Sequence, residues 1–188
     1  MFDTDSALDL ALNVFREKGY EGASLSDLTK AMGINRPSLY AAFGDKRSLF
    51  HKALERYSEG PALFMREALK ERTAKGVAES LLRGAVELQS SPGNPPGCLM
   101  VQGALACGTE AECVRQELIS HRSSAEKLLI QRFKRAKVEG DLPQDVNPTD
   151  LARFLTSVMY GMSVQAASGA SRVDLKRIAK TALQAWPE

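Results

Sequence analysis

Apolar residues recur at spacings of three and four along most of the chain, as in helices that bury one face. The first such stripe, which we expect to end before Gly19, consists of Leu8, Ala11, Leu12 and Phe15. Alternating apolar and polar runs bounded by turns, which are typical of strands, are almost absent. The pattern therefore predicts an all-α protein.

Capping residues predict where the next two helices begin and end. Ser24 and Asp27 have the spacing of a capping box, and Gly33 is a residue type that ends helices. Asn35 is a suitable N-cap for a short third helix that ends at Gly44. Two short helices therefore follow the first one closely.

Proline- and glycine-rich segments divide the rest of the chain. The clearest is "SSPGNPPG", residues 90–97, because clustered Pro and Gly cannot propagate a helix. Gly60-Pro61 and "GDLPQDVNP" are further breaks. We expect the later helices over residues 46–58, from the Gly60-Pro61 break to about 73, and over 75–90, 111–139, 148–168 and 173–186.

The charges are uneven although the net charge of the 188 residues is only +2. Residues 1–29 hold six acidic and two basic residues, whereas residues 30–56 hold six basic and two acidic ones. A basic surface concentrated in the second segment is what a phosphate-binding face requires. The 44% hydrophobic content also favours a packed core over disorder.

The three cysteines, Cys98, Cys107 and Cys113, are an odd number without CxxC spacing, which disfavours disulfides and a structural zinc site. No charged-then-apolar leader and no apolar run long enough to span a bilayer is present, so we expect a cytoplasmic protein. No nucleotide-binding fingerprint is present, and we predict neither a cofactor nor a metal nor catalysis. Cys98 is expected to be a buried, inert thiol; a sensor role is the alternative, but no cation adjoins it in sequence.

The segment that ends at Gly33 and resumes at Arg36 has the spacing of a helix-turn-helix. Pro37 is tolerated because its missing N–H falls in the first turn, where it would have no partner. Leu39 and Phe43 are expected to face inward, and Tyr40 outward. The first residues of such a second helix reach base edges in a major groove. The alternative is a helical corner with a solvated face.

"AMGINRPSLYAAFGDKRSLF", residues 31–50, resembles the recognition segment of TetR/AcrR-type transcriptional regulators, and "ALNVFREKGYEGASLSDL", residues 11–28, is similar to the segment that precedes it. The resemblance covers residues 7 to about 56. It implies an all-α homodimeric repressor with a helix-turn-helix DNA-binding domain, residues 1–46. Residues 47–188 would form a helical domain for ligand binding and dimerisation. The implied partners are a palindromic double-stranded operator and a small effector, and not a membrane.

Carried over by position, the resemblance implies that Arg36, Pro37 and Ser38 read bases. It assigns phosphate contacts to Ser24, Tyr40 and Lys46. The sequence favours a phosphate contact at Lys46 independently of the resemblance, because this residue places a cation beside the free N–H groups of a helix start. "MFDTDSALDL" departs from many members, which place a basic residue near the N-terminus; either that contact is absent or residues before Met1 supply it.

The central helices mix apolar and amide side chains, as the walls of a ligand chamber do. Few of these positions are charged, which favours a mainly apolar effector. The alternative is an ordinary packed core with surface glutamines. The predicted chamber residues are Phe64, Met65, Leu82, Val86, Gln89, Met100, Gln102, Met159, Met162 and Gln165.

Two apolar stripes after Pro148 suit an intersubunit bundle, although burial within one subunit would produce the same pattern. The predicted interface residues are Leu151, Phe154, Leu155, Val158, Met162, Leu175, Ile178 and Ala182. A tilt of the helix that starts at Lys46 would then link effector binding to release of DNA. The rival function is a small helical ligand carrier or enzyme whose corner only resembles a DNA reader.

Overall fold

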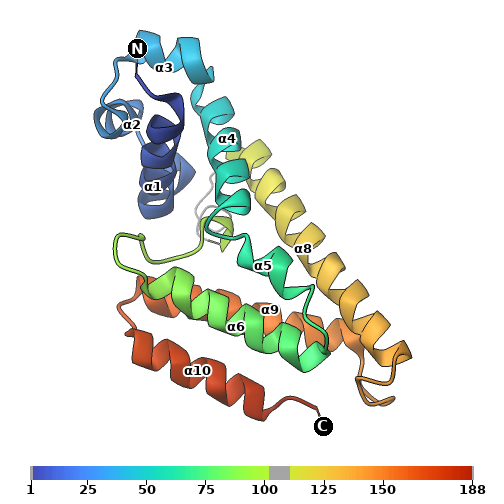
Figure 1. Ribbon diagram of the computed structural model, residues 1–188. Helices are drawn as coiled ribbons and strands as arrows, with labels where there is room; N and C mark the ends of the chain where they lie inside the picture. The colour runs from blue at the N-terminus through green and yellow to red at the C-terminus, as the bar shows by residue number, and fades with distance from the viewer. Residues whose placement is uncertain (1, 102–110, 188) are drawn as a thin grey trace. The chain divides into compact units, whose positions relative to one another are not determined.

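The computed structural model describes residues 2–101 and 111–187, and every regular element in these ranges is a helix (Figure 1). The all-α prediction is therefore confirmed. The helices are α1 (Thr4–Gly22), α2 (Leu25–Met32), α3 (Arg36–Phe43), α4 (Lys46–Glu59), α5 (Phe64–Ala68), α6 (Ala74–Ser90), α8 (Glu112–Val138), α9 (Pro148–Ala167) and α10 (Arg172–Gln184).

The chain divides into two compact units. Unit 1 consists of Met1–Leu63 and Gly97–Ile119, and unit 2 of Phe64–Pro96 and Ser120–Glu188. Unit 1 thus keeps α4 together with the first three helices. The predicted end of the DNA-binding domain at residue 46 concerns which helices contact DNA, and it stays a prediction.

Side-chain caps set the helix boundaries of unit 1. The Asp27 N–H donates to Ser24 Oγ at 3.0 Å and the Ser24 N–H donates to Asp27 Oδ2 at 3.1 Å, which completes the predicted capping box. Asn35 Oδ1 accepts from a first-turn N–H of α3 at 2.8 Å, and Asp45 Oδ1 does the same for α4 at 2.7 Å. These local contacts explain why short helices form here without long apolar stripes.

The predicted break of the first helix at Gly19 is confirmed, because the backbone leaves the helical conformation there. Helix α1 runs to Gly22, but Gly19 has φ 69° and ψ −179°, so the helix is kinked there. Glycine reaches this backbone conformation without a steric penalty, which is why the regular stretch breaks at this position.

The predicted helix up to about Thr73 is wrong, because α5 ends at Ala68 and a turn follows. The buried guanidinium of Arg132 donates to the carbonyls of Glu71 and Arg72 at 2.9 and 3.1 Å. Thr73 then caps α6. Arg132 of α8 thereby supplies the hydrogen bonds that these backbone carbonyls would otherwise accept within a continued helix.

Each unit has its own core. In unit 1 the Phe50 ring meets the rings of Phe15 and Tyr20 edge-on, with centroids 5.0 and 5.2 Å away. In unit 2, α6, α9 and α10 lie side by side (Figure 1). Phe133 of α8 joins this core and packs edge-on against Trp186 at 5.7 Å. Both cores follow the predicted three-and-four periodicity.

Candidate nucleic-acid interface

The turn between α2 and α3 holds the two helices in the predicted arrangement. Gly33 has φ 66° and its N–H closes the last turn of α2. Leu28 and Leu39 are fully buried, and Phe43 is 3% exposed. Since the inner face of α3 is fixed in this way, its first residues and its opposite face remain at the surface.

Arg36 lies exposed at the start of α3, and its Nη2 donates to Ser26 Oγ of α2 at 3.2 Å. Pro37 is exposed beside it, and Ser38 is half-buried. The Ser26 contact was not predicted, because no local spacing relates residues ten apart across a turn. It restrains the long arginine side chain, which lowers the entropy lost when the guanidinium binds a partner.

Tyr40 is 49% exposed whereas Leu39 is fully buried, which confirms the predicted orientations of both side chains. The phenol is thus accessible on the outer face of α3. Its contact with a phosphate stays a prediction.

Ser24 is exposed, but its hydroxyl is engaged in the capping box and donates to Asp27 Oδ2 at 2.7 Å. Asp27 also pairs with Lys18 of α1 at 2.6 Å. The Lys18 contact and the Ser24 bonds together lower the pKa of Asp27 to about 2. A phosphate at Ser24 would therefore share a hydroxyl that already fixes the start of α2.

Lys46 is less free than the sequence suggested. Its Nζ lies 4.6 Å from the centroid of the Tyr20 ring, and partial burial lowers its pKa. Arg47, its neighbour in the first turn of α4, is exposed and was not among the predicted contacts. Arg47 could have been predicted from the sequence, because it follows Lys46 at the capped start of a helix.

Two further cations tie α3 and α1 to α4. Lys52 Nζ donates to the carbonyl of Ala42 at 3.3 Å. Arg56 donates to both carboxylate oxygens of Asp9, at 2.8 and 2.9 Å. Part of the basic charge counted in residues 30–56 therefore forms contacts inside unit 1, whereas Lys30, Arg36 and Arg47 are exposed.

Cys98 lies beside charged and polar groups that its sequence neighbours do not supply. The Tyr57 hydroxyl lies 3.6 Å from Cys98 Sγ, and the Arg16 guanidinium carbon lies 5.6 Å from the centroid of the Tyr57 ring. Burial raises the pKa of Tyr57 well above its usual value. Tertiary structure thus places Arg16 near a cysteine that has no adjacent cation in sequence. Cys107 lies outside the described residues.

His51 of α4 gains an acidic partner that the sequence did not indicate. Its Nδ1 pairs with Glu117 of α8, and its Nε2 lies 3.5 Å from Glu55. The Glu117 carboxylate is the main cause of the raised pKa of His51. Because the folded pKa is raised, this link contributes most at acidic pH and is lost as the pH rises through the folded pKa.

Among the described residues, the predicted chamber residues are divided between two sites of unit 2. Met65 and Met159 line an apolar cavity of about 40 Å³ in unit 2, far below the ~300 Å³ of a usual ligand pocket. Leu82 and Val86 lie instead along a groove beside α10. Of the rest, Phe64 and Met100 are half-buried, Gln89 and Met162 are buried, Gln165 is exposed, and Gln102 lies outside the described residues.

The predicted dimer stripe is divided between the core and the surface. Phe154 is 40% exposed, and Val158 and Ile178 are half-buried. The other members are buried within the single chain: Leu151, Leu155, Met162, Leu175 and Ala182. Only the first group remains available to a partner subunit.

Metal-binding clusters and membrane-spanning helices are both absent from the residues that the structure describes. Among residues 2–101 and 111–187, no three His, Cys, Asp or Glu side chains are grouped as a metal would require. Within the same ranges no helix has the length and apolar character needed to cross a membrane.

The sequence matches two described protein families. Residues 7–53 match "Bacterial regulatory proteins, tetR family", and residues 78–182 match "Tetracyclin repressor-like, C-terminal domain". The HTH-type transcriptional repressor ComR of Escherichia coli K12 is 33% identical over 190 residues, which is 100% of this chain and 90% of ComR. The repressor BdcR of the same strain is 30% identical over 172 residues, 90% of this chain and 82% of BdcR.

A solved structure supports the same assignment. A cysteine mutant of the TetR family transcriptional regulator CifR, complexed with 26-bp double-strand operator DNA, superposes with a TM-score of 0.94. It is 41% identical, and the alignment covers 100% of this chain and 98% of the CifR chain.

Proposed function

We propose that this chain, which belongs to the TetR family of bacterial regulatory proteins, represses transcription as an operator-bound homodimer that a small effector releases. The chain is a transcriptional regulator, and its fold and relatives are not those of enzymes. The rival function of a small helical enzyme is therefore excluded.

The exposed start of α3 is the observation that carries the DNA-binding proposal. Arg36 is the only long cation in the first turn of this helix, and Ser26 holds it in place. Arginine reads guanine through two parallel hydrogen bonds in the major groove. Pro37, Ser38 and Tyr40 flank it. The CifR structure, which has the same fold, is complexed with operator DNA, and this supports the proposal that the present chain binds DNA. Lys46 and Ser24 would contact phosphate from the flanks.

The geometry of duplex DNA is the reason for proposing a homodimer. Two recognition helices must lie about 34–36 Å apart to enter successive major grooves. A symmetric pair of chains reads a palindromic operator, because the two half-sites are related by the same twofold axis as the subunits. Phe154, Val158 and Ile178 supply the apolar surface for this pairing.

Effector release requires a ligand that binds one spacing of the recognition helices better than the other, since equal affinity would shift nothing. Helix α4 is the element through which such a change would reach α3. An apolar effector fits the predicted chamber residues of unit 2, among which Met65 and Met159 already border a cavity. That cavity would have to widen for an effector to enter.

Arg36→Ala is expected to cost about 1–3 kcal/mol of operator binding and to relax base preference at one position of each half-site. Lys46→Ala should weaken binding to all sequences alike and reduce the salt slope by about one unit, because it removes a phosphate contact. Fluorescence anisotropy with a selected operator and with scrambled DNA at several salt concentrations separates the two effects.

Lys70→Ala is the matched control for these variants, since Lys70 is an exposed lysine of unit 2 that pairs with Glu67. It should bind operator as the unchanged protein does. If the Arg36 and Lys46 variants both bound operator with wild-type affinity, the proposed DNA-contacting surface at the starts of α3 and α4 would be wrong.

Effector release is tested with compounds extracted from the purified protein by heat or solvent and identified by mass spectrometry. A true effector should raise the melting temperature and lower operator affinity in parallel, because a ligand at 100 times its Kd stabilises the form that it binds by about 2.7 kcal/mol. A compound that stabilises the protein while operator binding stays constant is not the effector.

A further inference from the structure

We propose that a groove between α6 and α10 binds a small organic anion with an apolar body, such as a medium-chain carboxylate. The groove holds about 420 Å³, within the range of small-molecule sites. All of its lining residues belong to unit 2. Leu82 and Val86, two of the predicted chamber residues, line this groove, and the proposed site does not depend on DNA binding.

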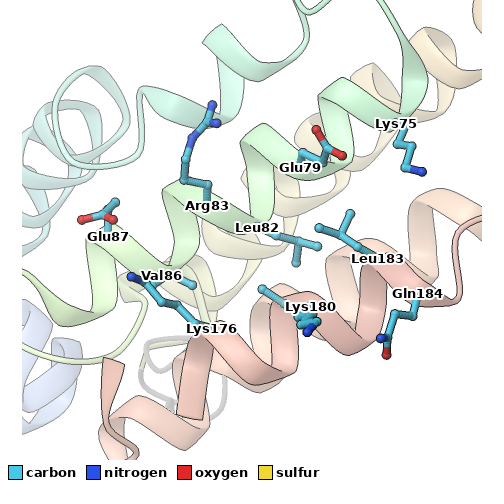
Figure 2. Close-up of a pocket in the computed structure, with 11 residues that line it drawn as sticks. Lys75, Glu79, Leu82, Arg83, Val86, Glu87, Lys176, Lys180, Leu183 and Gln184 are labelled. Atoms are coloured by element: carbon cyan, nitrogen blue, oxygen red, sulfur yellow. The ribbon is translucent and has the colours of Figure 1, made fainter. Parts of the chain in front are cut away.

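The floor of the groove is apolar. Leu82 and Val86 of α6 face Leu183 of α10 across it (Figure 2). Ala179 of α10 also lines the groove. Leu183 is half-buried, so part of its side chain is open to a ligand. From Lys176 to Gln184 the α10 wall extends about 12 Å at the rise of an α-helix. A floor of this composition and length suits an unbranched apolar chain rather than a polar metabolite.

The rim carries an excess of positive charge. Lys176 and Lys180 stand on α10, while Lys75 and Arg83 stand on α6 (Figure 2). Within the part of the chain that the structure describes, none of the three lysines forms an ion pair. Three ammonium groups beside one apolar floor would attract an anion whose body fills that floor.

The acidic side chains of the rim do not cancel this charge. Glu87 is already paired with Arg172 at 2.5 Å, and Arg172 also reaches Ser90 Oγ at 3.5 Å. Glu79 is therefore the acidic lining residue that opposes an incoming anion. Its removal should strengthen binding, which provides a test that a folding defect cannot imitate.

Charge decides between the possible occupants. A second copy of the same groove would bring lysines against lysines, and an uncharged ligand would leave their charge uncompensated. One carboxylate at the rim with an acyl chain along the floor satisfies both parts of the site. Ile178, a predicted dimer residue, does not line the groove, so the anion site and the predicted interface use different faces of α10.

Isothermal titration of the full chain with octanoate tests the proposal, with 1-octanol as the uncharged probe of equal chain length. One octanoate per chain should bind, and octanol should bind more weakly. The double variant Lys176→Gln/Lys180→Gln should bind octanoate about tenfold more weakly, because it loses two ion pairs. Glu79→Gln should bind it about twofold to threefold more tightly.

Arg177→Gln is the matched control, because Arg177 is an exposed cation of α10 that does not line the groove. It should leave octanoate binding unchanged. Absent octanoate binding, equal binding of octanol, or a double lysine variant with wild-type affinity would each overturn the proposal.

Discussion

Phe154→Glu is expected to convert the protein into monomers and to lower its operator affinity about 10²–10³-fold, although no residue near α3 changes. Phe154 is 40% exposed in the single chain, so the new carboxylate stays hydrated in a monomer. In the proposed dimer the same carboxylate would be buried without a partner, at a cost of about 3–5 kcal/mol. A monomer can occupy only one half-site, so the contribution of the second recognition helix is lost.

Light scattering gives the oligomeric state of this variant, and anisotropy gives its operator affinity. Val138→Glu is the matched control, since Val138 is an apolar residue of α8 that is 87% exposed. It should remain dimeric and bind operator normally. A Phe154→Glu protein that stays dimeric would place the interface on another surface.

Leu39→Ala is expected to have the second large effect, a loss of about 2–5 kcal/mol of folding stability. Leu39 is fully buried in unit 1, as is Leu28 of the preceding helix. The truncation leaves a cavity beneath α3, which has only 8 residues and depends on this packing because isolated helices of such length are unstable. The loss is a large share of a total stability of about 5–15 kcal/mol.

Tyr40→Ala separates stability from DNA binding at the adjacent position. Tyr40 is 49% exposed, so its truncation should change the free energy of unfolding by less than about 0.5 kcal/mol and weaken operator binding. Urea denaturation followed by circular dichroism measures the first quantity, and anisotropy the second. If Leu39→Ala were as stable as wild type while Tyr40→Ala unfolded readily, the orientation of α3 would be opposite to the one described.

Local sequence signals predicted the helix-turn-helix because the interactions that shape it are short-range. Ser24 caps α2 through a residue three positions away, and Asn35 caps α3 in the same way. Gly33 adopts the left-handed conformation that a glycine at a helix end favours. The inward and outward orientations of Leu39 and Tyr40 follow from helical periodicity alone.

The failures arose where distant residues determine the outcome. The chain was expected to remain helical to Thr73, but Arg132 binds carbonyls about 60 positions earlier and stabilises a turn. His51 of α4 pairs with Glu117 of α8, and no sequence spacing relates these two residues. Such contacts have no fixed spacing, so no sequence window contains them.

The sequence by itself determined the helical class, the helix-turn-helix and the family, because periodicity, capping and the motif of residues 31–50 depend on residues close together in the chain. Only the tertiary structure decided which apolar residues remain at the surface. Leu155 and Phe154 belong to one predicted stripe, but Leu155 is 1% exposed and Phe154 is 40% exposed. An apolar stripe buried within a subunit and one that forms an intersubunit interface have the same period. Only the packing of α6, α9 and α10 against the stripe distinguishes the two cases.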